Sequence, residues 1–319
     1  MGNAAKKALS VIIRIIVSFA ILFFLFKNID QKSLLKIIKD SDKPLLFISF
    51  LIFFCAYILG LIRWNMLLSA VNIRLPLKRL VASFSAGLFF NLFLPSTIGG
   101  DFMRGADLSF YTKRPKEVIA TLFLNRLSGY IGLVVLAVCA FIFGWKFLRD
   151  ESVLLSLEII AAALIIALLA LFNKFFYNKI NKLLKSPKAG NIRDLITSLH
   201  EEIHIFRYKK AVVAKNILLS VCIQAIIPLS FYITALSLGV KINPVYFFIF
   251  LPIIAAITLL PVSIGGLGLR DATAIFFFAK AGVAKDMAFA MSLLNFSFIL
   301  IIGVLGGLIY VLTVYNRRV

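Results

Sequence analysis

Several stretches of this chain are apolar over about 18 residues or more, the length that an α-helix needs to cross the roughly 30 Å hydrocarbon core of a bilayer. Six of them are expected to span a membrane: residues 9–26, 44–62, 118–145, 153–173, 214–238 and 287–314. Composition agrees, because 61% of the 319 residues are hydrophobic and only 15% are charged, against about 25% in a soluble domain. The sequence therefore predicts an all-α polytopic membrane protein with one membrane domain, residues 1–319.

The net charge of +21 is explained better by membrane orientation than by nucleic acid. No basic stripe interleaved with aromatic residues lies outside the predicted spans, so we expect no nucleic-acid partner. The linker 174–213 is strongly basic, which predicts that it lies on the cytoplasmic side. Two lysines before residues 9–26 indicate an uncleaved signal anchor. The three cysteines fall within predicted spans, form no CxxC pair and are expected to be buried: Cys55, Cys139 and Cys222.

Two further apolar segments, 80–95 and 244–261, end in proline, and a hydroxyl residue and a Gly-Gly pair follow soon after. Neither continues smoothly as a helix. If segment 80–95 crossed the membrane, the basic linker would lie outside; a turn back at 95–100 keeps it cytoplasmic. The same argument makes 244–285 a hairpin that enters from the outer face. We therefore predict two re-entrant helical hairpins and cytoplasmic N and C termini, with an interfacial helix within 27–43.

The tips of the two hairpins carry matching sequences. PSTIGGDFMR at 95–104 aligns without a gap with PVSIGGLGLR at 261–270, and LNRLS at 124–128 resembles LNFS at 294–297. Each half then reads span, span, hairpin, span, in opposite orientations. This predicts an inverted-topology repeat, as in many secondary transporters, formed by residues 1–145 and 153–319. Coincidence is the alternative, because Pro and Gly-Gly are common in membrane helices.

The chemistry of the tips suits an anion. A half-helix that begins at Gly-Gly exposes unpaired backbone N–H groups and the positive end of the helix dipole. Arg104 and Arg270 lie about one turn along the second arms, where each adds a guanidinium fork. Thr97 and Ser263 add hydroxyl donors. We therefore expect a phosphate-bearing ligand at the tips.

Charged side chains at membrane depth are costly, by about 2.5–3.5 kcal/mol on insertion scales, which favours a functional role for both arginines. The alternative is structural. Asp101 or Asp107 neutralises Arg104 in that case, and Asp271 neutralises Arg270.

Two other charged residues within predicted spans each have two possible roles. Arg126 either contributes to the site or extends its charged end to the inner interface. Glu158 is either a proton carrier or an interfacial residue.

One match to an enzyme signature is set aside. HEEIH at 200–204 fits H-E-x-x-H, which places His200 and His204 on one face of a helix. A zinc site needs a third ligand, and the acidic residues further along, Asp271 and Asp286, are predicted on the opposite side of the membrane. We therefore expect no metal, no cofactor and no catalytic residue.

Several of these motifs together resemble a known family. NLFLP at 91–95, GGD at 99–101, NR at 125–126 and PVSIGGLGLRD at 261–271 are similar to the lysylphosphatidylglycerol synthase transmembrane-region family, the flippase-like membrane domain of the multiple peptide resistance factor. The resemblance covers nearly the whole chain. It implies a bacterial or archaeal inner (plasma) membrane protein that moves a lipid between leaflets or serves a lipid-modifying pathway. Asp271 stands where the family usually has Glu, which keeps the carboxylate.

The expected function is transbilayer movement of an anionic phospholipid or lipid-linked head-group. The alternative is a membrane component of an aminoacyl- or glycosyl-transferase pathway, such as lysylphosphatidylglycerol synthesis, and a third reading is a scaffold for a synthase. No soluble aminoacyl-transferase domain follows Val319, which favours a transporter over an enzyme. The expected partners are an anionic or phosphate-bearing lipid and, alternatively, a lipid synthase or transferase. The candidate substrate-binding residues are Asn91, Thr97, Gly99, Gly100, Asp101, Arg104, Asn125, Arg126, Ser263, Gly265, Gly266, Arg270 and Asp271.

Overall fold

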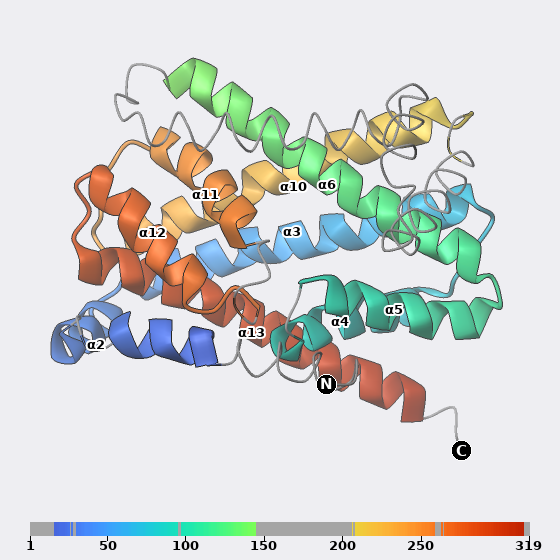
Figure 1. Ribbon diagram of the computed structural model, residues 1–319, viewed down its shortest axis with the longest axis horizontal. Coiled ribbons are helices and arrows are strands. Elements are labelled where there is room, and N and C mark those ends of the chain that lie inside the picture. The colour runs from blue at the N-terminus through green and yellow to red at the C-terminus, as the bar shows by residue number, and fades with distance from the viewer. Residues whose placement is uncertain are drawn as a thin grey trace, which may run out of the picture.

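The computed structural model describes residues 16–25, 27, 30–94, 97–144, 206, 208–258, 263 and 265–315. Regular secondary structure in these residues is entirely helical (Figure 1). Four of the described helices are long and apolar enough to cross a membrane: α3 (Lys43–Ala70), α6 (Pro115–Gly144), α10 (Lys210–Ser237) and α13 (Lys285–Tyr315). They coincide with four predicted spans. The predicted span 153–173 lies outside the described residues, and of 9–26 the structure shows a short apolar helix, Ile16–Leu25.

Local signals in the sequence explain where the first helices begin. Helix α2 (Gln31–Lys39) starts after Asp30, whose carboxylate accepts the N–H of Lys32 at 3.0 Å. Helix α3 starts after Asp42, whose carboxylate accepts the N–H of Leu45 at 3.0 Å. Both aspartates satisfy N–H groups that a helix start leaves without partners. The helix expected within 27–43 is therefore present as α2.

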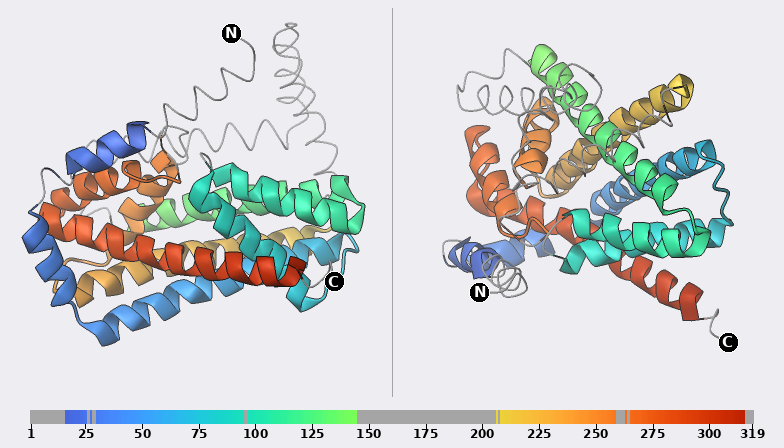
Figure 2. Two further views of the ribbon diagram at one scale, coloured as in Figure 1. Left: turned by 90° about the horizontal axis from the view of Figure 1, so that it is seen from below. Right: turned by 45° about the vertical axis from the view of Figure 1, so that its right-hand side comes forward.

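Four shorter helices form two hairpins. The first consists of α4 (Leu77–Phe93) and α5 (Thr97–Thr112), and the second of α11 (Val245–Thr258) and α12 (Leu269–Lys280). These helices contain 17, 16, 14 and 12 residues, so at about 1.5 Å per residue each is shorter than a hydrocarbon core. The hairpins occupy opposite ends of the molecule and turn near its middle (Figures 1 and 2). Each turn falls at the Pro…Gly-Gly motif.

Several helix contacts recur in both halves of the chain. Helix α3 packs along α10, where the Ser49 hydroxyl lies 2.7 Å from both the Ser230 carbonyl oxygen and the Thr234 hydroxyl. Helix α4 packs on α13, and α11 packs on α6. Each hairpin also contacts the long helix that follows it, α5 on α6 and α12 on α13. Exchanging α3 to α6 for α10 to α13 preserves these contacts, but not the extensive packing of α6 on α10, because α3 touches α13 only slightly.

Small residues allow the close approach of α4 and α13. A Cβ atom added to Gly306 would stand only 2.9 Å from the Cβ of Ser85. Closely packed helices with small residues at the contact are typical of membrane bundles, where lipid supplies no hydrophobic drive for association.

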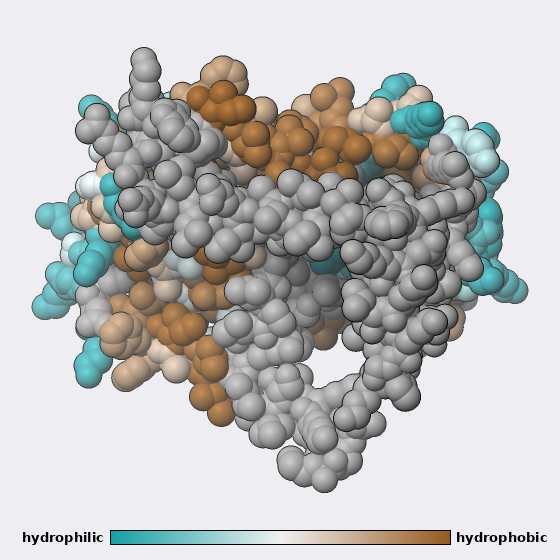
Figure 3. Space-filling model, turned by 45° about the horizontal axis from the view of Figure 1, so that its top comes forward, coloured by the Kyte–Doolittle hydropathy of each residue, from teal (hydrophilic) through white to brown (hydrophobic). Residues whose placement is uncertain are grey.

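Two separate groups of buried side chains make up the interior, one around each hairpin. Trp64, Leu80 and Phe84 belong to the group around the first hairpin, and Phe247 and Phe278 to the group around the second. Outward faces are apolar as well. On the visible face, hydrophobic side chains form a band and hydrophilic ones gather mainly at the two ends (Figure 3). A band of this kind suits contact with lipid.

The cysteines correct one expectation. Cys55, Cys139 and Cys222 lie within long apolar helices as predicted, but all three are exposed on the outer faces of those helices rather than buried. Helices that are apolar all round do not reveal from sequence which face points inward.

Candidate functional site

The first hairpin closes through a glycine contact. The N–H of Gly100 donates to the side-chain oxygen of Asn91 at 2.8 Å. A Cβ atom added to Gly100 would overlap the carbonyl oxygen of Gly87 on α4, so only glycine fits there. A Cβ atom on Gly99 would likewise stand 2.6 Å from Leu94. These glycines are needed for packing at the tip, and the N–H of Gly100 is already occupied.

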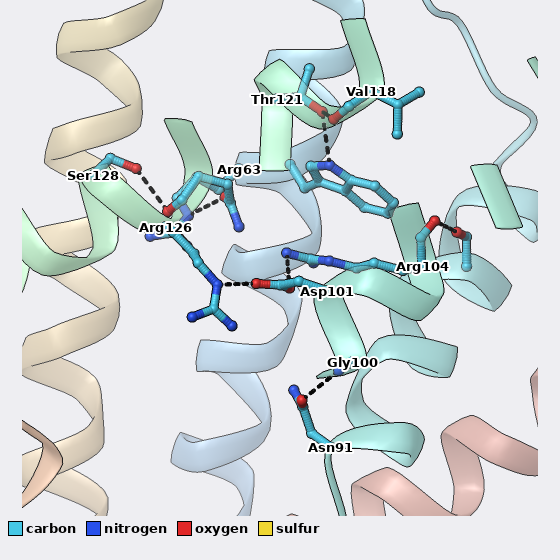
Figure 4. Close-up of polar contacts among 12 residues, drawn as sticks. Arg63, Asn91, Gly100, Asp101, Arg104, Val118, Thr121, Arg126 and Ser128 are labelled. Carbon is cyan, nitrogen blue, oxygen red and sulfur yellow. Dashed lines mark hydrogen bonds and ion pairs between the residues drawn. The ribbon is translucent and has the colours of Figure 1, made fainter. Parts of the chain in front are cut away.

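Asp101 lies between two arginines (Figure 4). One of its oxygens is 2.6 Å from an Nη atom of Arg104, one turn along α5. The other accepts from the Nε atom of Arg126 on α6. Arg126 also donates to the hydroxyl of Tyr130 at 3.1 Å. Arg126 therefore contacts the tip, as the site hypothesis requires, through the same carboxylate as Arg104.

Arg104 is buried among aromatic rings. Its guanidinium carbon lies 4.7 Å from the ring centroid of Trp64 and 5.3 Å from that of Phe84. Gly87 makes room for it, because a Cβ atom there would stand 3.0 Å from the Cδ of Arg104. The Nε atom of Arg104 is buried and has no hydrogen-bond partner among the described residues. Buried polar atoms are nearly always satisfied, so this atom is a candidate for contact with a ligand.

Arg63 on α3 is a third arginine at this site, and the sequence did not point to it. Its Nε atom donates to the side-chain oxygen of Asn125 at 2.9 Å, and an Nη atom donates to the hydroxyl of Ser220 at 2.6 Å. It also interacts electrostatically with Arg104 and Asp101. No carboxylate among the described residues forms an ion pair with Arg63. The predicted span ended at residue 62, whereas α3 continues to Ala70.

We call Arg63, Asp101, Arg104 and Arg126 the basic cluster. Arg63 lies about 10 Å along the axis from the Ala70 end of α3, and Arg126 about 16 Å from the Pro115 end of α6. The basic cluster is therefore inside the apolar part of the bundle, on the side of the first hairpin. It combines three guanidinium groups with one carboxylate.

Around the basic cluster, neutral polar side chains join three long helices. The hydroxyl of Ser128 donates to the side-chain oxygen of Asn216, and the amide of Asn216 donates to the Arg63 carbonyl oxygen at 3.2 Å. Arg63 completes this network through Ser220. These bonds hold α3, α6 and α10 together behind the first tip.

The second tip is arranged differently. Asp271 is fully buried and accepts from Arg270 at 2.8 Å, from the Ser292 hydroxyl at 2.5 Å and from the N–H of Gly268 at 3.1 Å. Arg270 stacks on Phe296, with 4.6 Å between its guanidinium carbon and the ring centroid. Here one carboxylate pairs with one guanidinium, and that carboxylate also accepts the N–H of Gly268, the residue before α12.

The two tips touch each other. A Cβ atom added to Gly265 would stand 3.4 Å from the carbonyl oxygen of Asn91 at the end of α4. Gly266 adopts a φ of +77°, which other residues rarely adopt. Ser263 is buried, and its hydroxyl has no hydrogen-bond partner among the described residues.

The structure therefore brings Asp101, Arg104 and Arg126 into the basic cluster, and Asn125 bonds to it through Arg63. Arg270 and Asp271 form a separate ion pair. Arg104 and Arg270 both have the acidic partners that the structural alternative named, although Asp107 pairs with Arg79 at 2.6 Å and not with Arg104. The side chain of Thr97, Glu158 and the HEEIH segment lie outside the described residues. In the part of the chain that is described, no group of three His, Cys, Asp or Glu residues could hold a metal ion.

Comparison with known proteins places the chain in a family. The sequence profile described as the lysylphosphatidylglycerol synthase TM region matches residues 11–307. Similar proteins include a UPF0104 membrane protein of Pyrococcus horikoshii, 23% identical over 316 positions that cover 91% of this chain and 92% of that protein. Another is a UPF0104 membrane protein of Methanothermobacter thermautotrophicus, 24% identical over 288 positions that cover 82% of this chain and 81% of that protein. This chain therefore belongs to the lysylphosphatidylglycerol synthase TM-region family and is a multi-pass membrane protein.

Proposed function

We propose that this protein moves an anionic phospholipid or lipid-linked head-group from one leaflet of a plasma membrane to the other, and that the basic cluster holds the head-group. The observation that carries the proposal is the environment of Arg63. Its guanidinium lies within the apolar part of the bundle, beside Arg104, and all its described hydrogen-bond partners are neutral. The basic cluster holds three guanidinium groups and one carboxylate, an excess of positive charge that is unfavourable in low dielectric, and a phosphate supplies negative charge to balance it.

The chemistry of the basic cluster suits a phosphate in particular. Guanidinium groups form paired, charge-assisted hydrogen bonds with phosphate oxygens. The unpartnered Nε atom of Arg104 adds a donor at the same place. Asp101 holds Arg104 and Arg126 in position, and as the one carboxylate of the basic cluster it leaves the cluster with a net positive charge.

The arrangement of the hairpins favours movement across the membrane. The two hairpins come from opposite ends of the bundle, and their tips meet near its middle. We interpret them as re-entrant hairpins of an inverted repeat, with both termini in the cytoplasm. Transporters built from inverted repeats place their sites where broken helices meet, and they open alternately to either side.

A lipid-modifying role is the second candidate, and the family name favours it. A chain of this family that serves lysylphosphatidylglycerol synthesis or a glycosyl-transferase pathway would present the lipid to a transferase. The same basic cluster would then hold the lipid at one leaflet, with no transfer between leaflets.

Reconstitution separates these functions. The purified full chain is placed in phosphatidylcholine vesicles that contain a trace of acyl-labelled phosphatidylglycerol or acyl-labelled phosphatidylcholine. A membrane-impermeant reductant bleaches label in the outer leaflet, so transbilayer movement makes all of the label accessible. We expect faster movement of phosphatidylglycerol than of phosphatidylcholine. Equal rates for both lipids, or no movement of either, would contradict the proposal.

Two variants sharpen this assay. Arg63→Gln removes a charge-assisted contact worth about 1.5–3 kcal/mol, which predicts a loss of roughly tenfold or more in apparent affinity for the anionic lipid. Arg114→Gln removes one charge from a partly exposed pair with Glu117 outside the basic cluster and should leave movement unchanged. A new lipid product on addition of an aminoacyl-tRNA or a nucleotide sugar, without lipid movement, would instead support the second candidate.

A further inference from the structure

A separate feature lies on the outer face of the second hairpin. A shallow, open groove of about 450 Å³ on α12 is lined by Ala272, Ile275, Phe276, Ala279, Lys280 and Lys285. The first four residues follow a three-and-four spacing, so they share one face of the helix. Phe276 is 54% exposed, which shows that this apolar face is not covered by another described helix.

Two lysines stand at one end of this groove. Lys280 is the last residue of α12, and Lys285 is the first of α13. Both are exposed, and the Lys280 ammonium lies 4.8 Å from the ring centroid of Phe276. The turn between these helices is at an end of the bundle (Figure 1). Asp286, in the first turn of α13, is the acidic residue next to them in sequence.

An apolar groove that ends in cations at the polar edge of a membrane protein matches the shape of one phospholipid. The groove takes an acyl chain, and the lysines meet the phosphate. Each lysine that pairs with the phosphate at an exposed site contributes up to about 1 kcal/mol, which favours an anionic lipid by up to about fivefold. Ordinary lipid contact explains an apolar face but not a hollow with a cationic end.

We propose that the α12 groove is a binding site for one anionic phospholipid, with the acyl chain along Ala272 to Ala279 and the phosphate against Lys280 and Lys285. This site is distinct from the basic cluster, which belongs to the first hairpin. It does not depend on whether the protein moves lipids.

Photo-crosslinking tests the occupant directly. The full chain in an uncharged detergent is incubated with phosphatidylglycerol that carries a photoreactive group about halfway along one acyl chain. We expect crosslinks on α12 within residues 272–279, identified by mass spectrometry of peptides. Phosphatidylcholine with the same photoreactive chain should label this segment several-fold less. Equal labelling by the two lipids would overturn the head-group assignment.

Variants of exposed residues test the two parts of the site without disturbing the interior. Lys280→Gln with Lys285→Gln should reduce labelling by phosphatidylglycerol several-fold, by up to about 25-fold. Ala279→Phe fills the groove and should abolish labelling while the lysines stay in place. Lys113→Gln, in the turn between α5 and α6, is the charge control and should have no effect.

Other occupants are outcomes of the same experiment. A photoreactive fatty acid that labels residues 272–279 as strongly as phosphatidylglycerol would overturn the phospholipid assignment. A crosslink between two copies of the chain through this groove would also overturn it. Arg63→Gln should leave labelling unchanged, so failure of the groove and failure of the proposed function are distinguishable.

Discussion

At the first hairpin tip, two arginines share one carboxylate and a third arginine binds only neutral groups, whereas at the second tip one arginine meets one carboxylate. Both tips carry an arginine at the same place in one motif. The spans around each tip decide what that arginine does. The first tip has Arg63 and Arg126 beside it, while the second has Phe296 and Ser292. This difference is the reason why we propose that the first hairpin binds the anion and the second supports the fold.

The largest expected effect on stability comes from a substitution at the second tip. Asp271→Asn removes a fully buried carboxylate that accepts three hydrogen bonds and leaves Arg270 without its ion-pair partner, which should lower the free energy of unfolding by about 3–5 kcal/mol. Adding Arg270→Gln should restore most of the lost free energy of unfolding, because the unpaired positive charge is then removed. Thermal unfolding in an uncharged detergent measures both variants. A double variant as unstable as the single one would show that the ion pair between Arg270 and Asp271 does not stabilise the fold as described.

At the first tip, Asp101→Asn should cost less, about 2–3 kcal/mol, because the Asp101 side chain is 17% exposed rather than fully buried. This variant should regain stability when phosphatidylglycerol is added, since phosphate replaces the lost carboxylate. Asp271→Asn should show no such recovery. Recovery by both variants, or by neither, would remove the distinction between the tips.

The motif glycines sharpen the comparison in a different way. Gly100→Ala should destabilise the first hairpin by about 1–3 kcal/mol or more, because the added Cβ atom overlaps the Gly87 carbonyl. Gly266→Ala has room, with 3.4 Å to the side chain of Thr258, but its φ of +77° should cost about 1–2 kcal/mol. Unfolding midpoints of the two variants test this order. The reverse order would mean that the tips are packed in another way.

The smallest effect on stability is expected for Arg63→Gln, about 1 kcal/mol, because its hydrogen-bond partners are neutral. We expect a larger loss in affinity for the anionic lipid than in stability. Arg63→Lys should not restore binding, since lysine lacks the fork that bonds Asn125 and Ser220 together. Titration of each variant with phosphatidylglycerol checks this, and full binding by Arg63→Gln would argue against its role.

The positions of the hairpins could be predicted from the sequence because strong local signals agree there. Prolines and Gly-Gly pairs interrupt apolar segments too short to cross a membrane, and the structure turns at both positions. The spans α3, α6, α10 and α13 were equally clear from their length. Membrane insertion, the positions of the termini and the inverted repeat stay predictions.

The site was harder to predict, because it depends on contacts between distant helices. Arg63 lay one residue beyond a predicted span, and only the continuation of α3 to Ala70 brings it beside Asn125. The use of Asp271 as a cap for its own helix had a local signal, Gly268 followed three residues later by an acid. The balance of charges at the first tip had no local signal in the sequence, because Arg126 approaches Asp101 from another helix.

The central claim is that the first tip binds the transported anion and the second does not. The most direct test compares two paired variants in the vesicle assay, Asp101→Asn with Arg104→Gln and Asp271→Asn with Arg270→Gln, at temperatures where both are folded. We predict that the first pair loses phosphatidylglycerol movement by about tenfold or more, while the second pair retains it. Full movement in the first pair would contradict the claim, because its arginine would then be structural.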